Sequence, residues 1–182
     1  IMDKLYQDVD IYDNSIYLLA HEFTSPISVL APTIYKFFII DTTEVNGKSC
    51  INLAFTPRNK ADYAFTGSLY VLNDGTYNIA KVSMSVPKQI NVNFVKDLSL
   101  EQEFTQYHDS IWMLSKDKLI IDYNITKKGR GFFGNRTVFY NNFDFNKEQA
   151  DSIYNPIEKL IKVEDNTNQT EEFWTTARPD TL

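Results

Sequence analysis

Alternation of apolar and polar residues runs through the middle of the chain, from residue 35 to about residue 145, and turn sequences interrupt it. The clearest run is 76–86, in which Ala80, Val82, Met84 and Val86 alternate with Lys81, Ser83 and Ser85. Successive side chains of a strand point to opposite faces of a sheet. This two-residue period therefore indicates antiparallel strands with one solvent-exposed face. The chain must therefore build most of its core on β-sheet.

Turn residues divide this region into hairpins. Asn46-Gly47 separates the apolar runs 35–41 and 49–55, and it suits a two-residue turn with positive φ at both positions. The sequence Asn-Asp-Gly at 73–75 plays the same part between the runs 65–72 and 76–86. With further runs at 90–94, 98–104, 110–114, 118–125 and 136–145, we expect eight or nine strands.

Helical patterns are few and lie towards the two ends of the chain. We expect an N-terminal helix near residues 2–9, a second over 147–163 that begins after Asn146 and is kinked at Pro156, and a short one at 170–177. Eight or nine strands at about 4.8 Å spacing make a sheet roughly 40 Å wide. One helix covers only about 10 Å of that width, so a flat sheet would leave apolar surface bare.

These widths predict a single domain over residues 1–182 with an α+β fold. We expect a curled antiparallel sheet, or half-barrel, of about eight or nine strands with two or three helices on its concave side. The apolar runs Phe-Phe-Ile-Ile at 37–40 and Leu-Ile-Ile at 119–121 suggest strands covered on both faces. A start at Ile1-Met2 suggests a piece excised from a larger protein.

Composition excludes several classes of function. A formal charge of −6 argues against nucleic-acid binding, which needs a surplus of cations to neutralise phosphates. No stretch is long and apolar enough for a transmembrane helix, and the first residues do not form a signal peptide. The single cysteine, Cys50, interrupts no strand pattern and is expected to be a buried strand residue. These features therefore do not identify the cellular compartment.

The sequence Gly-Arg-Gly-Phe-Phe-Gly at 129–134 has the spacing of a dinucleotide-binding loop. That motif needs a helix at its end, and the residues that follow favour a strand, so we do not expect nucleotide binding. A Gly-rich loop between strands, with exposed basic residues, explains it better. The alternative is a loop that meets an anionic partner such as a lipid headgroup. Its candidate residues are Lys127, Lys128, Arg130, Phe132, Phe133 and Arg136.

No pattern of catalytic residues or metal ligands stands out. His21-Glu22 begins like a zinc-protease motif, but Ser25 occupies the place of the second histidine. Glu101 and Glu103 share a strand face and could act as paired carboxylates, although a solvated face explains them as well. We therefore expect no enzyme activity, no metal and no cofactor.

Aromatic residues are abundant, with 13 Phe and 11 Tyr. Most such residues fill cores, but with few helices to plug a concave sheet some could line an open apolar cavity. The candidates for that cavity are Tyr35, Phe37, Phe94, Phe104, Trp112 and Phe139.

Several long stretches resemble one protein family, most specifically "FTGSLYV" at 65–71 through "NFV" at 93–95. The chain resembles the central region of Gram-negative outer-membrane proteins of unknown function, which carry a carboxypeptidase-regulatory-like β-sandwich in front and a predicted membrane β-barrel behind. The order of its strands is also similar, more loosely, to the lipoprotein-sorting half-barrel that holds acyl chains. The first resemblance implies a location on the periplasmic side of the outer membrane, and it carries over no catalytic or binding residues.

The sequence thus predicts a non-enzymatic binding domain of the cell envelope, holding a lipid or another apolar molecule in the concave face of the half-barrel. The alternative is a structural spacer or protein-interaction domain that links the β-sandwich module to the barrel and meets an envelope protein partner.

Overall fold

The structure is a computed structural model, and it describes residues 7, 9–90, 92, 95–108, 111–124, 131–143, 145 and 148. The chain divides into two compact units, residues 1–143 and 144–182. All elements of secondary structure described here belong to the first unit. They are β1 (Ser15–Leu18), β2 (His21–Thr24), α2 (Ala31–Ile34), β3 (Tyr35–Val45), β4 (Lys48–Pro57), β5 (Thr66–Leu72), β6 (Ile79–Ser85), β7 (Val95–His108), β8 (Ile111–Asn124) and β9 (Gly131–Phe139).

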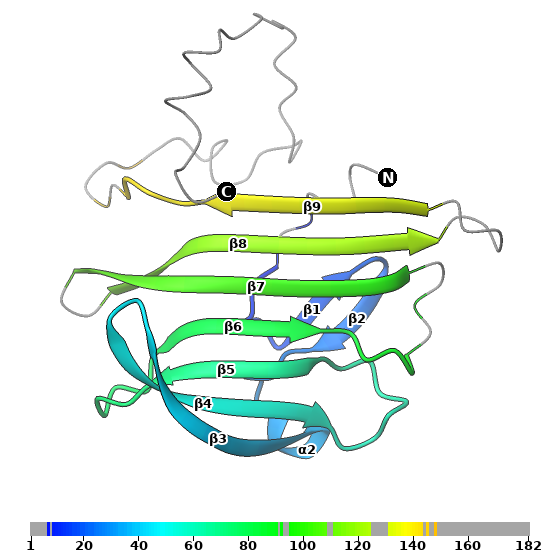
Figure 1. Cartoon of the computed structure of the whole chain (residues 1–182), viewed down its shortest axis with the longest axis horizontal. Helices are drawn as coiled ribbons and strands as arrows, with labels where there is room; N and C mark the ends of the chain where they lie inside the picture. The colour runs from blue at the N-terminus through cyan, green and yellow to red at the C-terminus, as the bar shows by residue number, and fades with distance from the viewer. Residues whose placement is uncertain are drawn as a thin grey trace, which may run out of the picture. The chain divides into compact units, whose positions relative to one another are not determined.

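Seven of the strands form one antiparallel sheet in the order β3-β4-β5-β6-β7-β8-β9. Each strand pairs with its neighbours in the sequence, so the sheet is a simple meander (Figure 1). The turn between β3 and β4 has positive φ at Asn46 and Gly47, as the sequence predicts. β1 and β2 pair with each other in a separate hairpin, and their turn residues Leu19 and Ala20 also have positive φ.

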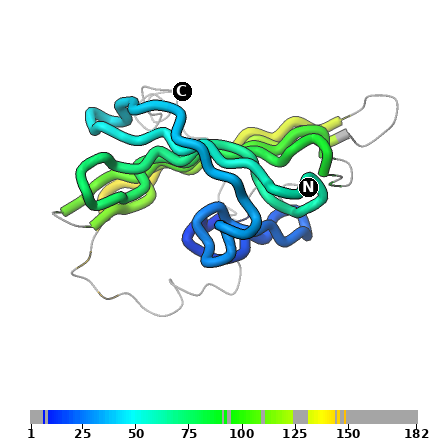
Figure 2. Tube along the Cα trace, turned by 90° about the horizontal axis from the view of Figure 1, so that it is seen from below, coloured from blue at the N-terminus to red at the C-terminus, as the bar shows by residue number. Residues whose placement is uncertain are grey.

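Residues 9–34, which we call the N-terminal layer, pack on one face of the large sheet (Figure 2). We call this face the inner face and the opposite one the outer face. The apolar side chains of the layer join those of the sheet in one core cluster, and the layer contributes Val9, Ile11, Ile16, Leu18, Leu19, Phe23 and Ala31. The core is therefore a two-layer arrangement with apolar residues between the layers.

Strand register explains which residues reach this core. Phe55, Gly67, Met84, Leu100 and Leu119 lie side by side across five neighbouring strands of the inner face. Gly67 is required here, since a Cβ at this position would lie 2.1 Å from the carbonyl oxygen of Ser83 and 2.7 Å from the Cα of Met84. The close approach of β5 and β6 therefore depends on glycine.

The predicted α+β half-barrel is wrong. The sheet is not curled, and the described residues contain a single four-residue helix, α2, so this part of the chain is nearly all β. The N-terminal layer, not bending of the sheet, hides the apolar face, because its own hairpin and loops supply the covering side chains. The helix expected at 170–177, and most of those expected at 147–163 and 2–9, lie outside the described residues.

Three expectations about strands also need correction. The run at 37–40 is not covered on both faces, because β3 is an edge strand and Phe38, Ile39 and Ile40 are 51%, 72% and 60% exposed. The runs 110–114 and 118–125 belong to one continuous strand, β8. In the expected strand at 90–94, the described residues Ile90 and Val92 lie outside any strand.

Candidate binding surfaces

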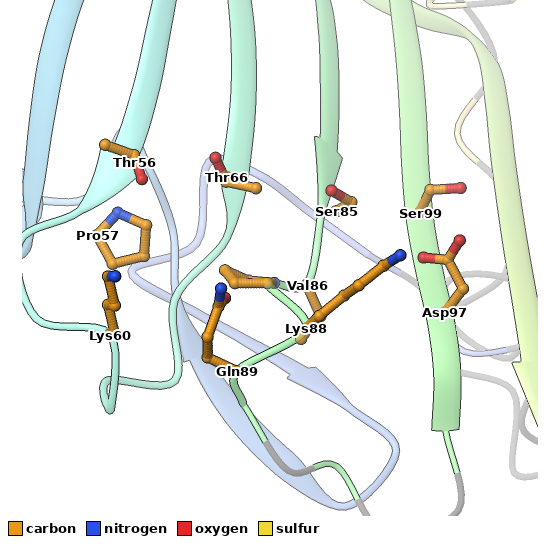
Figure 3. Close-up of a pocket in the computed structure, with 11 residues that line it drawn as sticks. Thr56, Pro57, Lys60, Thr66, Ser85, Val86, Lys88, Gln89, Asp97 and Ser99 are labelled. Carbon is orange, nitrogen blue, oxygen red and sulfur yellow. The ribbon is translucent and has the colours of Figure 1, made fainter.

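A polar hollow of about 570 Å³ lies at one end of the outer face (Figure 3). Hydroxyl groups from four neighbouring strands, β4 to β7, line it in a row: Thr56, Thr66, Ser85 and Ser99. Charged and amide side chains, Lys60, Lys88, Gln89 and Asp97, surround the row, and Pro57, Val86 and Pro87 complete the lining. The hollow can therefore offer donors, acceptors and charge to a small polar ligand.

The polar groups of this hollow have few partners within the protein. Thr66 Oγ1 donates a hydrogen bond to the carbonyl oxygen of Phe55 at 3.2 Å. Within the described part of the chain, Lys60, Lys88 and Asp97 make no ion pair. These groups are thus available to a ligand.

The middle of the outer face is different, because its charges neutralise one another. Lys81 Nζ lies 2.9 Å from Glu101 and 3.4 Å from Glu103, and Lys116 Nζ lies 3.3 Å and 3.2 Å from the same two carboxylates. Burial tends to raise the pKa of Glu101, but hydrogen bonds and charges from both lysines hold its pKa below the usual value. Glu101 and Glu103 therefore belong to an ion-pair network, which suits a solvated face better than acid–base catalysis.

An apolar groove of about 360 Å³ lies on the inner face, beside the N-terminal layer. Its walls come from both layers: Pro26, Ile27, Ala31 and Pro32 on one side, and Phe37, Leu53, Leu69, Val71, Tyr77 and Ile79 on the other. Phe37 belongs to the edge strand β3, and the groove residue Leu53 pairs with the exposed Ile39 of the same strand. The groove thus continues to the edge of the sheet.

That edge is formed by β3, which pairs only with β4 among the described strands. An unpaired edge presents backbone N–H and C=O groups to any strand that can lie beside it. Phe38, Ile39 and Ile40 add three consecutive exposed apolar side chains, and the pairing shifts by one residue between Ile39 and Asp41. The edge strand and the groove together give the described surface an apolar region that includes Phe37, Phe38, Ile39 and Ile40.

The residues predicted to line an apolar cavity are dispersed. Tyr35 is fully buried in the core, where its hydroxyl donates to the carbonyl oxygen of Thr24 and accepts from the N–H of Phe65 at 3.0 Å. Burial raises the pKa of Tyr35 to about 12. Phe104 is also buried. Phe139 is 38% exposed and lies on β9, the strand at the edge of the sheet opposite β3.

Three of the predicted residues line hollows, and two of them, Phe104 and Trp112, share one. Phe37 lies in the apolar groove. Trp112 borders a hollow of about 300 Å³ beneath the tip of the β3–β4 hairpin, where Lys48 Nζ lies 5.3 Å from its ring centroid and 2.8 Å from Gln106 Oε1. Phe94 lies outside the described residues. The structure therefore does not gather the six aromatics around one cavity.

The basic loop is described only in part, because Lys127, Lys128 and Arg130 lie outside the described residues. A strand and no helix follows the motif, as the sequence predicts, but β9 already begins at Gly131, so residues 131–134 belong to the strand and not to the predicted loop. Phe132 is half-buried against the core, and Phe133 is 65% exposed. Arg136 points to the inner face and pairs with the buried carboxylate of Asp117, so its charge already has a partner.

A buried polar network surrounds Arg136. Its Nη1 donates to the carbonyl oxygen of Gln7 at 3.2 Å. The side-chain nitrogen of Gln102 donates to Val9 O at 2.7 Å and to Asp117 Oδ1 at 2.9 Å. These contacts fasten the start of the N-terminal layer to β7, β8 and β9, which gives the network a structural role.

The remaining reactive side chains have ordinary surroundings. His21 stacks on Tyr63 with ring centroids 4.9 Å apart. Cys50 is buried beside Leu72 and Ala80, and burial raises the pKa of its thiol. The described residues include no group of three or more His, Cys, Asp or Glu side chains that could hold a metal ion. Nor do they include a helix that is long and apolar enough to cross a membrane.

Comparison with known proteins gives one result. Residues 2–143 match the profile of a family of unknown function, DUF5686. The chain belongs to this family. The matched residues contain the N-terminal layer and the whole seven-stranded sheet, so the family covers every surface described above. No curated protein and no solved structure matches the chain.

Sequence reasoning missed both surfaces. The polar hollow is assembled from Thr56, Thr66, Ser85 and Ser99, which occupy polar positions of four separate strands. Alternation placed Ser85 on a wet face, but only the register of neighbouring strands shows that the four hydroxyls form one row. The groove was missed because one of its walls comes from residues 26–32, a loop and a short helix whose position on the sheet depends on contacts distant in sequence.

Proposed function

We propose that this domain is a protein-interaction domain, which docks an extended segment of a partner protein along the edge of β3. The exposed run Phe38-Ile39-Ile40 on an unpaired edge, next to an apolar groove, is the observation that carries the proposal. A strand added to a sheet edge obtains affinity from main-chain hydrogen bonds and specificity from pockets for alternate side chains. Here the apolar groove would receive the side chains that point to the inner face.

The energetics favour an apolar partner segment at this edge. Fully burying an exposed Ile or Phe side chain is worth about 1.5–3 kcal/mol. Three such residues lie in sequence on the unpaired edge, with Phe38 and Ile39 pointing to opposite faces of the sheet, so an added strand can bury apolar side chains on both faces. A protein segment uses this surface better than an acyl chain does, because only a polypeptide can also satisfy the free N–H and C=O groups of β3.

This proposal replaces the expected lipid carrier. An acyl chain held in a half-barrel needs a concave sheet, and the sheet is not curled. The alternative role, a structural spacer or protein-interaction domain, needs no such cavity. We therefore propose a non-enzymatic module on the periplasmic side of the outer membrane, within a larger protein that has a β-sandwich in front and a barrel behind.

Site-directed photocrosslinking tests the docking edge. A photoreactive amino acid is placed at position 40 of the larger protein that contains this chain, and crosslinking is carried out in intact cells. The crosslinked peptides of the partner should map to one polypeptide segment. The substitution Ile39→Lys should lower the yield several-fold, because a lysine at the edge opposes strand addition. Position 133, an exposed aromatic on the opposite edge strand β9, is the matched control. Equal yields at both positions, or adducts with lipid only, would contradict the proposal. Fractionation of the envelope tests the location.

A further inference from the structure

We infer that the polar hollow of the outer face binds a sugar that carries an acidic group. This site is separate from the β3 edge and does not depend on the docking proposal. Its volume of about 570 Å³ lies within the range of small-molecule sites, roughly 300–1,000 Å³. The chemistry of its lining decides what such a ligand must offer.

The row of hydroxyls calls for a ligand rich in hydroxyl groups. Thr66 faces Ser85 and Ser85 faces Ser99 in the strand register, and Thr56 completes the row on β4. With strands about 4.8 Å apart, four hydroxyls span roughly 14 Å. A hydroxyl can both donate and accept a hydrogen bond, so such a row matches the mixed donors and acceptors of a sugar.

The charges of the hollow call for one acidic group on that sugar. Two lysines, Lys60 and Lys88, stand against one aspartate, Asp97, in a chain whose formal charge is −6. In Figure 3 the Lys88 side chain extends across the hollow towards Ser99 and Asp97. An ammonium that has no ion-pair partner among the described residues can bind a carboxylate or a phosphate, whereas Asp97 can accept hydrogen bonds from sugar hydroxyls.

The contrast with the middle of the same face supports this assignment. There, Lys81 and Lys116 each contact both Glu101 and Glu103, so no charge is left for a ligand. In the hollow, the lysines and the aspartate are left without such partners in the described part of the chain. Pro57, Val86 and Pro87 add an apolar lining against which the C–H groups of a sugar ring can pack.

Titration of the isotope-labelled 182-residue chain, followed by NMR chemical shifts, tests the inference. The probes are glucuronic acid, glucose 6-phosphate, glucose and inorganic phosphate. Both acidic sugars should shift the backbone signals of Ser85, Gln89 and Ser99, and should bind at least tenfold more tightly than glucose or phosphate. Whichever acidic sugar binds more tightly identifies the preferred anion, carboxylate or phosphate.

Variants separate this site from general attraction of anions. Lys88→Gln should weaken binding of both acidic sugars at least fivefold and leave glucose unchanged. Lys96→Gln changes the net charge equally, but Lys96 pairs with Asp122 outside the hollow, so this variant should bind like the parent chain. Ser99→Ala should weaken all three sugars. The spectra report folding of each variant directly.

Three results would overturn the inference. The first is no shift with either acidic sugar at millimolar concentration. The second is binding of inorganic phosphate as tight as that of glucose 6-phosphate and unchanged by Ser99→Ala, which would leave only an anion site. The third is equal weakening by Lys88→Gln and Lys96→Gln, which would show attraction by net charge alone.

Discussion

Consecutive residues of β7 and β8 take part in two polar networks on opposite faces of the same sheet. Glu101, Glu103 and Lys116 belong to the outer network, whereas Gln102 and Asp117 belong to the inner one. The side chains of Glu101 and Lys116 are 28% and 27% exposed, but that of Asp117 is only 3% exposed. Similar charges thus lie one residue apart in very different surroundings. Burial therefore decides how much each ion pair contributes to the stability of the fold.

The two networks also have different structural roles. The inner network joins β7, β8 and β9 to the backbone of Gln7 and Val9, so it holds the N-terminal layer in place over the core. The outer network joins only side chains of the sheet to one another. Removing one member of a buried ion pair leaves the other charge buried without a partner. Removing one member of an exposed ion pair leaves the other charge in contact with water. This difference can be measured.

The largest effect is expected for Arg136→Met. The substitution leaves Asp117 buried without its cation, so the free energy of unfolding should fall by about 3–5 kcal/mol. Urea denaturation followed by circular dichroism gives this value. The double variant Asp117→Leu with Arg136→Met removes both charges and should recover most of the loss. A single variant that loses less than about 1 kcal/mol would place the inner pair in the same class as an exposed one.

A smaller effect is expected for Gln102→Leu, which keeps the side-chain volume but loses both hydrogen bonds. The carbonyl oxygen of Val9 is left without its donor, and the expected cost is about 1–3 kcal/mol. Because Gln102 fastens the start of the N-terminal layer, limited proteolysis should cut the first residues of the variant sooner than those of the parent chain. Unchanged proteolysis with reduced stability would show that the bond stabilises the sheet without holding the layer.

The two networks show what the sequence could reveal. Alternation assigned Glu101 and Glu103 to one strand face, and their wet environment follows from that pattern alone. The same alternation puts Gln102 and Asp117 on the apolar face, where a polar residue signals a buried partner. The sequence instead groups their partner Arg136 with the cations of a basic loop, because nothing in the local sequence shows that β9 turns this side chain towards Asp117. Pairing across strands decides such contacts.

The fold shows the same division between local and distant information. Turn chemistry at Asn46-Gly47 and at 73–75 located two hairpins correctly, since these depend on a few neighbouring residues. The half-barrel prediction is wrong because a hairpin and loops, and not only helices, can cover the apolar face of a sheet. Residues 9–34 cover it with a hairpin and loops, and their packing depends on contacts distant in sequence, such as Tyr35 to Thr24 and Phe65.

The smallest effect is expected for Glu101→Gln on the outer face. Burial raises the pKa of Glu101, but Lys81 and Lys116 outweigh it, and the pKa lies below its usual value of 4.5. A carboxyl whose pKa falls on folding stabilises the fold above its unfolded pKa, and this stabilisation disappears as the pH falls through the folded pKa. At pH 7 the free energy of unfolding of the unsubstituted chain should therefore exceed that of the variant by less than about 1 kcal/mol. Addition of 0.5 M salt should reduce this difference further.

The pH dependence distinguishes this small effect from a change in packing. As the pH falls below 4.5, the difference between parent and variant in the free energy of unfolding should shrink towards zero, since Glu101 becomes neutral like glutamine. Urea midpoints at pH 7, 5 and 3 supply the measurement. A difference that stays constant with pH would mean that the side chain stabilises by packing and not by charge. The outer network would then differ from the inner one in kind and not only in strength, because only the inner one would depend on its ion pair.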